Sequence, residues 1–144
     1  MVKNLEVYNN SNKKIDKRII HRLVHGLKKE LGFNVSSLQI DFVTSDQILK
    51  INRDYLNHNF STDIITFNYS GDHKILEGEL IISVHDAEVS AKKYSVTFDE
   101  EIIRLVIHGI LHLLNFDDKK AKDREIMKHM ENTLLNSHKF ALLT

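Results

Sequence analysis

The stretch from residue 108 to residue 118, HGILHLLNFDD, contains the side chains best suited to chemistry in this 144-residue chain. Its histidines, His108 and His112, are four residues apart, which on a helix puts their Cβ atoms about 5–6 Å from each other. Two imidazoles at this spacing can bind one metal ion. The chain has no cysteine, so any further side-chain ligand must be a histidine or a carboxylate. The pattern therefore predicts a metal site on these histidines, against the alternative of two polar residues in a core helix.

The third ligand depends on where this helix ends. Asn115 follows three residues after His112, and asparagine readily adopts the left-handed conformation that ends many helices. A chain reversal at Asn115 would bring Asp118 beneath the histidines, at the offset where some zinc peptidases place their third ligand. We predict Asp118, ahead of Asp117, as that ligand. The alternative is that one of the two aspartates caps the final helix.

The helix that carries the histidines is expected to be buried. Apolar residues cover about two-thirds of its circumference when positions 101–115 are placed on a helical wheel. Polar side chains in such a core are unfavourable unless they find partners. The remaining narrow stripe contains Glu101, Arg104, His108, His112 and Asn115.

Two imidazoles, one carboxylate and an open position suit a catalytic Zn²⁺, which lowers the pKa of bound water to about 7. The same ligands suit non-haem Fe(II). A peptidase is excluded, because the H-E-x-x-H peptidases carry their general base where this chain has Gly109. Gly109 itself indicates either the close approach of a neighbouring backbone or substrate, or tight helix packing.

Not every histidine pair is expected to bind metal. His21 and His25 have the same spacing, but they point away from the apolar arc of their helix and precede no carboxylate at a chain reversal. We predict that both are solvated surface residues.

The length and composition of the chain limit the classes of protein to which it can belong. A chain of this length fits one domain, residues 1–144. The 20 basic and 20 acidic residues balance, so bulk charge does not indicate nucleic-acid binding. No apolar run approaches the roughly 18 residues of a membrane span, and the lack of cysteine suits a cytoplasmic location. Nothing in the sequence indicates an oligomeric state.

Strand and helix patterns mix without strict alternation, which favours an α+β fold with about four strands in a small mixed sheet and about five helices. The metal site is expected at the end of the buried helix. We predict strands at 2–8, 38–42, 63–68 and 78–83, and helices at 16–31, 45–55, 84–94, 97–114 and 119–136. Ser45 is expected to cap the second helix and Thr97 the fourth.

The sequence resembles the YbeY-type endoribonucleases, the bacterial ribosomal-RNA maturation factors. Their signature H-G-x-L-H-L-x-G-Y-D-H is similar to residues 108–118. A second family block, L-N-x-x-Y-R-x-x-D-x-P-T-D-V-L-S-F, resembles residues 51–67, and a third, G-D-I-x-I-S, resembles residues 78–83. The resemblance covers nearly the whole chain.

The resemblance implies a zinc-dependent hydrolase that cuts single-stranded RNA. It further implies roles in maturing the 3′ end of 16S ribosomal RNA in the small subunit and in ribosome quality control. Two residues depart from the family pattern: the third histidine is replaced by Asp118, and the arginine after the tyrosine is replaced by Leu56. The carboxylate adds negative charge to the site, and the leucine removes a group that resembles a phosphate contact.

Other basic residues could contact RNA phosphates in place of that arginine. The candidates are Lys119 and Lys120, directly after the metal motif, together with Arg53 and Arg104. The alternative for the lysines is a solvated helix face. His58 is a candidate for proton transfer. The competing functions are a ribosome-assembly factor with a structural metal and a small-molecule metallohydrolase.

Overall fold

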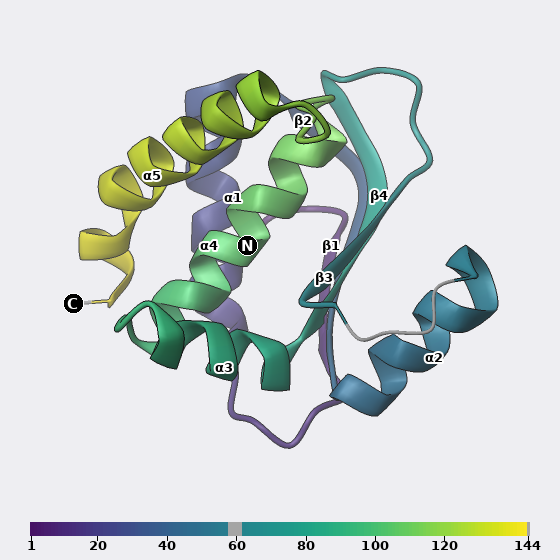
Figure 1. The fold of residues 1–144 in the computed structure, drawn as a ribbon. Coiled ribbons are helices and arrows are strands. Elements are labelled where there is room, and N and C mark those ends of the chain that lie inside the picture. Colours follow the sequence, from purple (N-terminus) through teal and green to yellow (C-terminus); the bar gives the residue numbers. More distant parts are fainter. Residues whose placement is uncertain (58–61, 144) are drawn as a thin grey trace.

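A computed structural model describes residues 1–57 and 62–143 of the chain. Four strands form one mixed sheet in the order β1-β2-β4-β3 (Figure 1). β1 and β4 run parallel to β2, whereas β3 runs antiparallel to β4 and forms one edge. The strands are β1 (Leu5–Asn9), β2 (Asn34–Val43), β3 (Ile64–Asn68) and β4 (Ile75–Ser83).

The helices lie on both faces of this sheet. In Figure 1, α1, α3, α4 and α5 cover one face and α2 covers the other. The predicted α+β class, the mixed sheet and the number of strands and helices are confirmed for the described residues. The helices are α1 (Lys17–Leu31), α2 (Ser45–Leu56), α3 (Val84–Lys93), α4 (Phe98–Leu113) and α5 (Ala121–Leu143).

Strand alternation divides the apolar residues between two clusters. On β4, Leu80 and Ile82 belong to the main core beneath the larger helical layer, whereas Ile81 belongs to a smaller cluster with Ile48 of α2. This division follows from the two-residue period of side chains along a strand. α4 lies in the middle of the main core and contacts β3, β4, α3 and α5. Its burial fixes the element on which the histidines lie.

Two predicted helix boundaries were wrong. The α2 cap is Thr44, not Ser45, because Thr44 and Gln47 form a reciprocal capping box. α5 continues to Leu143, well past the predicted end at residue 136. No glycine or proline follows residue 119, so the sequence contains no strong stop signal for this helix.

The prediction that His21 is solvated is also wrong, although His25 is exposed as expected. The His21 side chain is only 8% exposed, and its Nδ1 accepts a hydrogen bond from the Val2 backbone N–H at 3.2 Å. The reason is tertiary: the segment before β1 crosses this face of α1, which the periodicity of the helix alone does not show.

Among the described residues, no helix combines the length and the apolar character needed to cross a membrane.

Gly78 allows the end of α4 to lie close to the sheet, so a larger residue at this position should destabilise the protein. A methyl group at Gly78 would lie 2.6 Å from the Phe67 carbonyl oxygen and 2.9 Å from Leu113 Cδ2. We expect Gly78→Ala to lower the free energy of unfolding by about 1–3 kcal/mol, measured by urea denaturation, because the backbone of β3 must move. Gly71→Ala is the control, since its methyl would meet no described heavy atom within 4 Å. Equal stability of the two variants would contradict this packing.

Candidate metal centre

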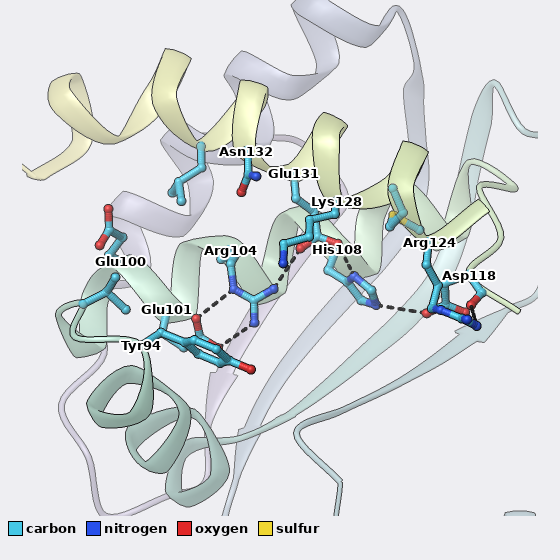
Figure 2. Close-up of a pocket in the computed structure, with 13 residues that line it drawn as sticks. Tyr94, Glu100, Glu101, Arg104, His108, Asp118, Arg124, Lys128, Glu131 and Asn132 are labelled. Carbon is cyan, nitrogen blue, oxygen red and sulfur yellow. Dashed lines mark hydrogen bonds and ion pairs between the residues drawn. The ribbon is translucent and has the colours of Figure 1, made fainter. Parts of the chain in front are cut away.

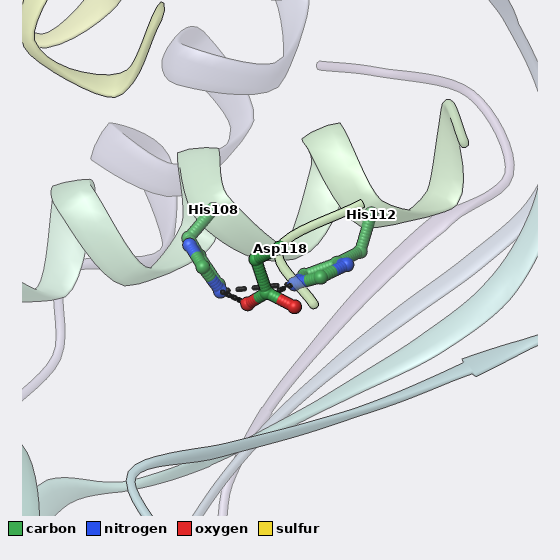
Figure 3. Close-up of side chains that lie close together, drawn as sticks. All are labelled: His108, His112 and Asp118. Carbon is green, nitrogen blue, oxygen red and sulfur yellow. Dashed lines mark hydrogen bonds and ion pairs between the residues drawn. The ribbon is translucent and has the colours of Figure 1, made fainter. Parts of the chain in front are cut away.

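The polar stripe of α4 brings the two histidines together at its C-terminal end. His108 and His112 are both partly buried, and their Nε2 atoms lie 3.0 Å apart. The ring centroids are 4.6 Å apart with an interplanar angle of 76°, so both rings direct one nitrogen toward the same point (Figure 3). The predicted juxtaposition of the imidazoles is therefore present.

The helix ends where the sequence predicted, and Asn115 makes the reversal. Asn115 adopts φ 72°, in the left-handed region. Its N–H donates to the His112 carbonyl at 3.0 Å, and the Phe116 N–H donates to the Leu111 carbonyl at 3.0 Å. This pair of bonds is the Schellman arrangement, which satisfies carbonyl groups that the helix end would otherwise leave unpaired.

The reversal brings Asp118 to the histidines. Asp118 Oδ2 lies 3.2 Å from His112 Nε2 and 3.7 Å from His108 Nε2. Asp117 points elsewhere: its Oδ1 accepts hydrogen bonds from the backbone N–H groups of Asp118 and Lys119, at 2.7 and 3.1 Å. The two aspartates thus divide the roles that the sequence left open, with Asp117 shaping the loop and Asp118 facing the imidazoles.

The three side chains fit a metal ion. Their candidate ligand atoms all lie within 4.8 Å of one another. Ligands about 2.0–2.1 Å from a tetrahedral Zn²⁺ lie roughly 3.3 Å apart, which is close to the three separations above. Without a cation, a ring N–H must lie in one of these short contacts, whereas a bound cation would satisfy all three donor atoms together.

A network of charged side chains, Glu101, Arg104 and Glu131, contacts His108 on the side of its ring away from Asp118. Glu131 of α5 is 5% exposed, and its Oε2 lies 2.5 Å from His108 Nδ1. Arg104 Nη1 donates to Glu131 Oε1 at 2.8 Å. The Arg104 guanidinium also donates twice to Glu101, at 2.8 and 2.7 Å (Figure 2). Of this network, Glu131 was missed by the sequence analysis.

These contacts change the titration of the groups involved. Burial opposes the charged form of His108, but the hydrogen bond and the charge of Glu131, with the charges of Asp118 and Asp63, raise its pKa above the ordinary value. Hydrogen bonds to Glu101 raise the pKa of Arg104 despite its burial. Burial raises the pKa of Asp63, while the positive charges of His108 and Arg104 act in the opposite direction.

Asp63 is a second carboxylate that the sequence analysis did not select. It precedes β3, and its charge acts on that of His108. The available signal was its position in the block at residues 51–67 that resembles the family. No pattern of spacing connects it to the histidines, because the two segments meet only when α4 packs against β3.

Gly109 has a packing role. A methyl group there would lie 2.8 Å from Leu80 Cδ2 and 3.0 Å from Ile64 Cδ1. Side chains of β4 and β3 therefore fill the space above this helix position, which is the tight-packing interpretation. The glycine allows α4 to lie close to the sheet between the two histidines.

The candidate RNA contacts lie in different surroundings. Lys119 and Lys120 are exposed beside Asp118. Arg53 is exposed on α2, which covers the opposite face of the sheet from α4 (Figure 1). Arg104 is partly buried and paired with two carboxylates. His58 lies outside the described residues, so its proposed part in proton transfer is not addressed by the structure.

A groove lies beside the metal candidate, with a volume of about 420 Å³. Residues of α4 and α5 line it, and His108 and Asp118 lie along one wall (Figure 2). Tyr94 also lines the groove, together with Arg124 and Lys128 of α5. The site is therefore reached from an open surface.

Comparison with known proteins identifies the family of the chain. The family model described as Endoribonuclease YbeY matches residues 2–139. The chain belongs to the YbeY family. The match spans the sheet, α4 and the loop that carries Asp118.

Individual relatives named Endoribonuclease YbeY match most of this chain and most of their own length. A protein of Azobacteroides pseudotrichonymphae named Endoribonuclease YbeY is 42% identical over 86% of this chain and 86% of its own length. A protein of the same name from Chlorobium limicola is 34% identical over 93% of this chain and 92% of its own. A solution structure from Thermotoga maritima, 23% identical, covers 91% of this chain and 86% of its own with a TM-score of 0.65. The last comparison supports the fold alone.

The left-handed residue at the helix end can be tested directly. We expect Asn115→Ala to lower the free energy of unfolding by about 1–2 kcal/mol, because a methyl side chain disfavours positive φ. The exposed Asn115 side chain packs little, so a larger loss is not expected. Asn115→Gly is the matched variant and should be at least as stable as the parent protein, since glycine is the preferred residue at this position. Thermal and urea denaturation measure both; tolerance of alanine equal to that of glycine would contradict the assigned turn.

Proposed function

We propose that this YbeY-family chain is a single-strand-specific endoribonuclease whose Zn²⁺ is held by His108, His112 and Asp118. The observation that carries the proposal is the convergence of three ligand atoms within 4.8 Å at the open end of a buried helix. The names of the relatives, Endoribonuclease YbeY, supply the reaction class, and the ligand types supply the metal chemistry.

The chain's own residues have distinct parts in this proposal. When bound, the metal would supply Lewis-acid chemistry for phosphodiester hydrolysis. His108 and His112 each present Nε2, and Asp118 adds a negative oxygen where the family signature carries a histidine. Asp118 lowers the net positive charge of the loaded site, so cationic side chains near the rim gain importance for an anionic substrate.

We propose Lys119 and Lys120 as cations that meet RNA at this rim. They follow Asp118 directly and their side chains are exposed. The loop that carries them is fixed by Arg124, whose Nη1 donates to the Lys119 carbonyl at 2.8 Å. Arg53 remains a candidate contact on the α2 side, and Arg104 is a weaker one because Glu101 and Glu131 already pair with it.

In the cell, we propose that the substrate is ribosomal RNA of the small subunit, with 16S 3′-end maturation and ribosome quality control in the cytoplasm as the context. Residues 1–144 would act as one metallohydrolase domain. A ribosome-assembly factor with a structural metal and a small-molecule metallohydrolase are the alternatives that the following experiment separates.

The central test is cleavage of end-labelled single-stranded RNA by the zinc-loaded chain, with duplex RNA alongside. We expect cleavage of the single strand, its loss after chelation and its return with zinc. His112→Ala should lower the rate by more than about 100-fold, because loss of a ligand exceeds the effect of losing an outer partner. The matched control is His129→Ala, which removes an exposed histidine on α5.

The outcomes separate the three functions. If zinc-loaded protein leaves RNA intact while His112→Ala unfolds at lower temperature, the metal is structural and the endoribonuclease proposal is wrong. Turnover of small phosphodiesters without turnover of RNA would favour the small-molecule hydrolase.

The role of the loop lysines can be tested separately. We expect Lys119→Ala with Lys120→Ala to weaken binding of single-stranded RNA and to reduce its salt dependence, because two phosphate contacts are removed. Zinc content should stay unchanged, since neither side chain is a metal ligand. Lys28→Ala with Lys29→Ala, in the last turn of α1, is the control pair. RNA affinity that falls equally in both pairs would show a general charge effect and no specific contact.

A further inference from the structure

Glu131 occupies an unusual place for a carboxylate. It lies on α5, 23 residues from His108 in sequence, yet only 5% of it is exposed. Both of its oxygens have partners: Oε2 faces His108 Nδ1 at 2.5 Å and Oε1 accepts from Arg104 Nη1 at 2.8 Å. A buried carboxylate is retained only where such partners balance its desolvation.

The contact fixes which nitrogen of His108 carries the proton. An ionised carboxylate can only accept a hydrogen bond, so Nδ1 must be the donor in this pair. The proton on Nδ1 leaves the lone pair of the neutral ring on Nε2. Nε2 is the atom that faces His112 Nε2 at 3.0 Å and Asp118 Oδ2 at 3.7 Å (Figure 3).

Arg104 holds the carboxylate in this orientation. Its guanidinium is anchored on Glu101 by two hydrogen bonds, and Glu101 is 1% exposed. The third hydrogen bond of the guanidinium then directs Glu131 Oε1 away from the histidine, which leaves Oε2 free for His108 (Figure 2). Arg104 therefore acts through Glu131, and its charge is already paired with two carboxylates.

The network also carries a charge that matters for a cation. In their ionised forms, Glu101 and Glu131 contribute two negative charges and Arg104 one positive charge, so the three together carry one net negative charge. This charge lies directly behind His108, where it favours a cation on the other side of the ring.

We propose that Glu131 is a positioning residue, which sets the His108 tautomer and raises the metal affinity of the site from α5. The inference rests on the metal site of the proposed function and extends it, because it makes the C-terminal helix part of that site. Metal-ligating histidines commonly donate their second ring N–H to a carboxylate, and loss of that partner weakens metal binding about 10–100-fold.

The test is a zinc titration of the full chain against a competing chromophoric chelator, with zinc alone as the probe. Glu131→Gln keeps the side-chain size but removes the charge, and its single amide oxygen cannot serve both Arg104 and His108. We expect a zinc dissociation constant about 10–100-fold higher than in the parent chain. The matched control is Glu125→Gln, the same change at an exposed position of α5, which should leave the constant unchanged.

The outcomes distinguish this inference from the function on which it rests. If the parent chain binds no zinc, the metal site and this inference both fail. If the parent chain binds zinc and Glu131→Gln binds it within about twofold of the parent, only the positioning role of Glu131 is overturned. If Glu125→Gln weakened zinc binding as much as Glu131→Gln, the positioning role would also be overturned, because the effect would then come from the overall charge of α5.

A second measurement needs no variant, so it holds even if Glu131→Gln fails to fold. Imidazole ¹⁵N spectra of the zinc-free parent chain report which ring nitrogen is protonated, provided that the pH is well above the raised pKa of His108. We expect His108 to carry its proton on Nδ1, with zinc then shifting the resonance of Nε2. A His108 ring protonated on Nε2 in the zinc-free chain would contradict the inference.

Discussion

The burial of α4 is the constraint on which the rest of the site depends. This helix packs against β3 and β4 on one side and against α3 and α5 on others, so it has little freedom to rotate. Gly109 and Gly78 bring it close to the sheet, because a side chain at either position would meet neighbouring atoms. Rotation of α4 would bury polar side chains without partners, so the direction of its polar stripe is fixed by the hydrophobic core.

Given that constraint, two later segments complete the site: the turn directly after α4, and α5. The Schellman turn at Asn115 is local and brings Asp118 back to the histidines within six residues of His112. Glu131 arrives from α5, whose apolar residues Met127 and Leu134 are part of the same core. The three candidate ligands therefore come from one short segment, whereas the carboxylate behind His108 comes from α5, 23 residues away in sequence. This arrangement couples the electrostatics of the site to the packing of α5.

Much of the fold and the central trio could be predicted from the sequence because their signals are local. The four-residue spacing of the histidines, the left-handed tendency of Asn115 and the apolar circumference of α4 each act within a few residues. Three residues whose placement was wrong or missing in the predictions depend on tertiary contacts. His21 is covered by a segment from outside its helix, Asp63 reaches the site only through the contact of β3 with α4, and Glu131 is an ordinary charged residue in the sequence of α5. The Thr44 cap was misplaced by one residue, within the usual uncertainty of helix ends.

The proposed metal site depends on three atoms: His108 Nε2, His112 Nε2 and Asp118 Oδ2. The most direct test is a crystal structure of the zinc-loaded chain with anomalous scattering data collected at the zinc edge. We expect a single strong anomalous peak at the centre of these atoms, about 2.0–2.2 Å from each. A peak elsewhere on the chain, or imidazoles that stay metal-free in crystals grown with zinc, would contradict the account.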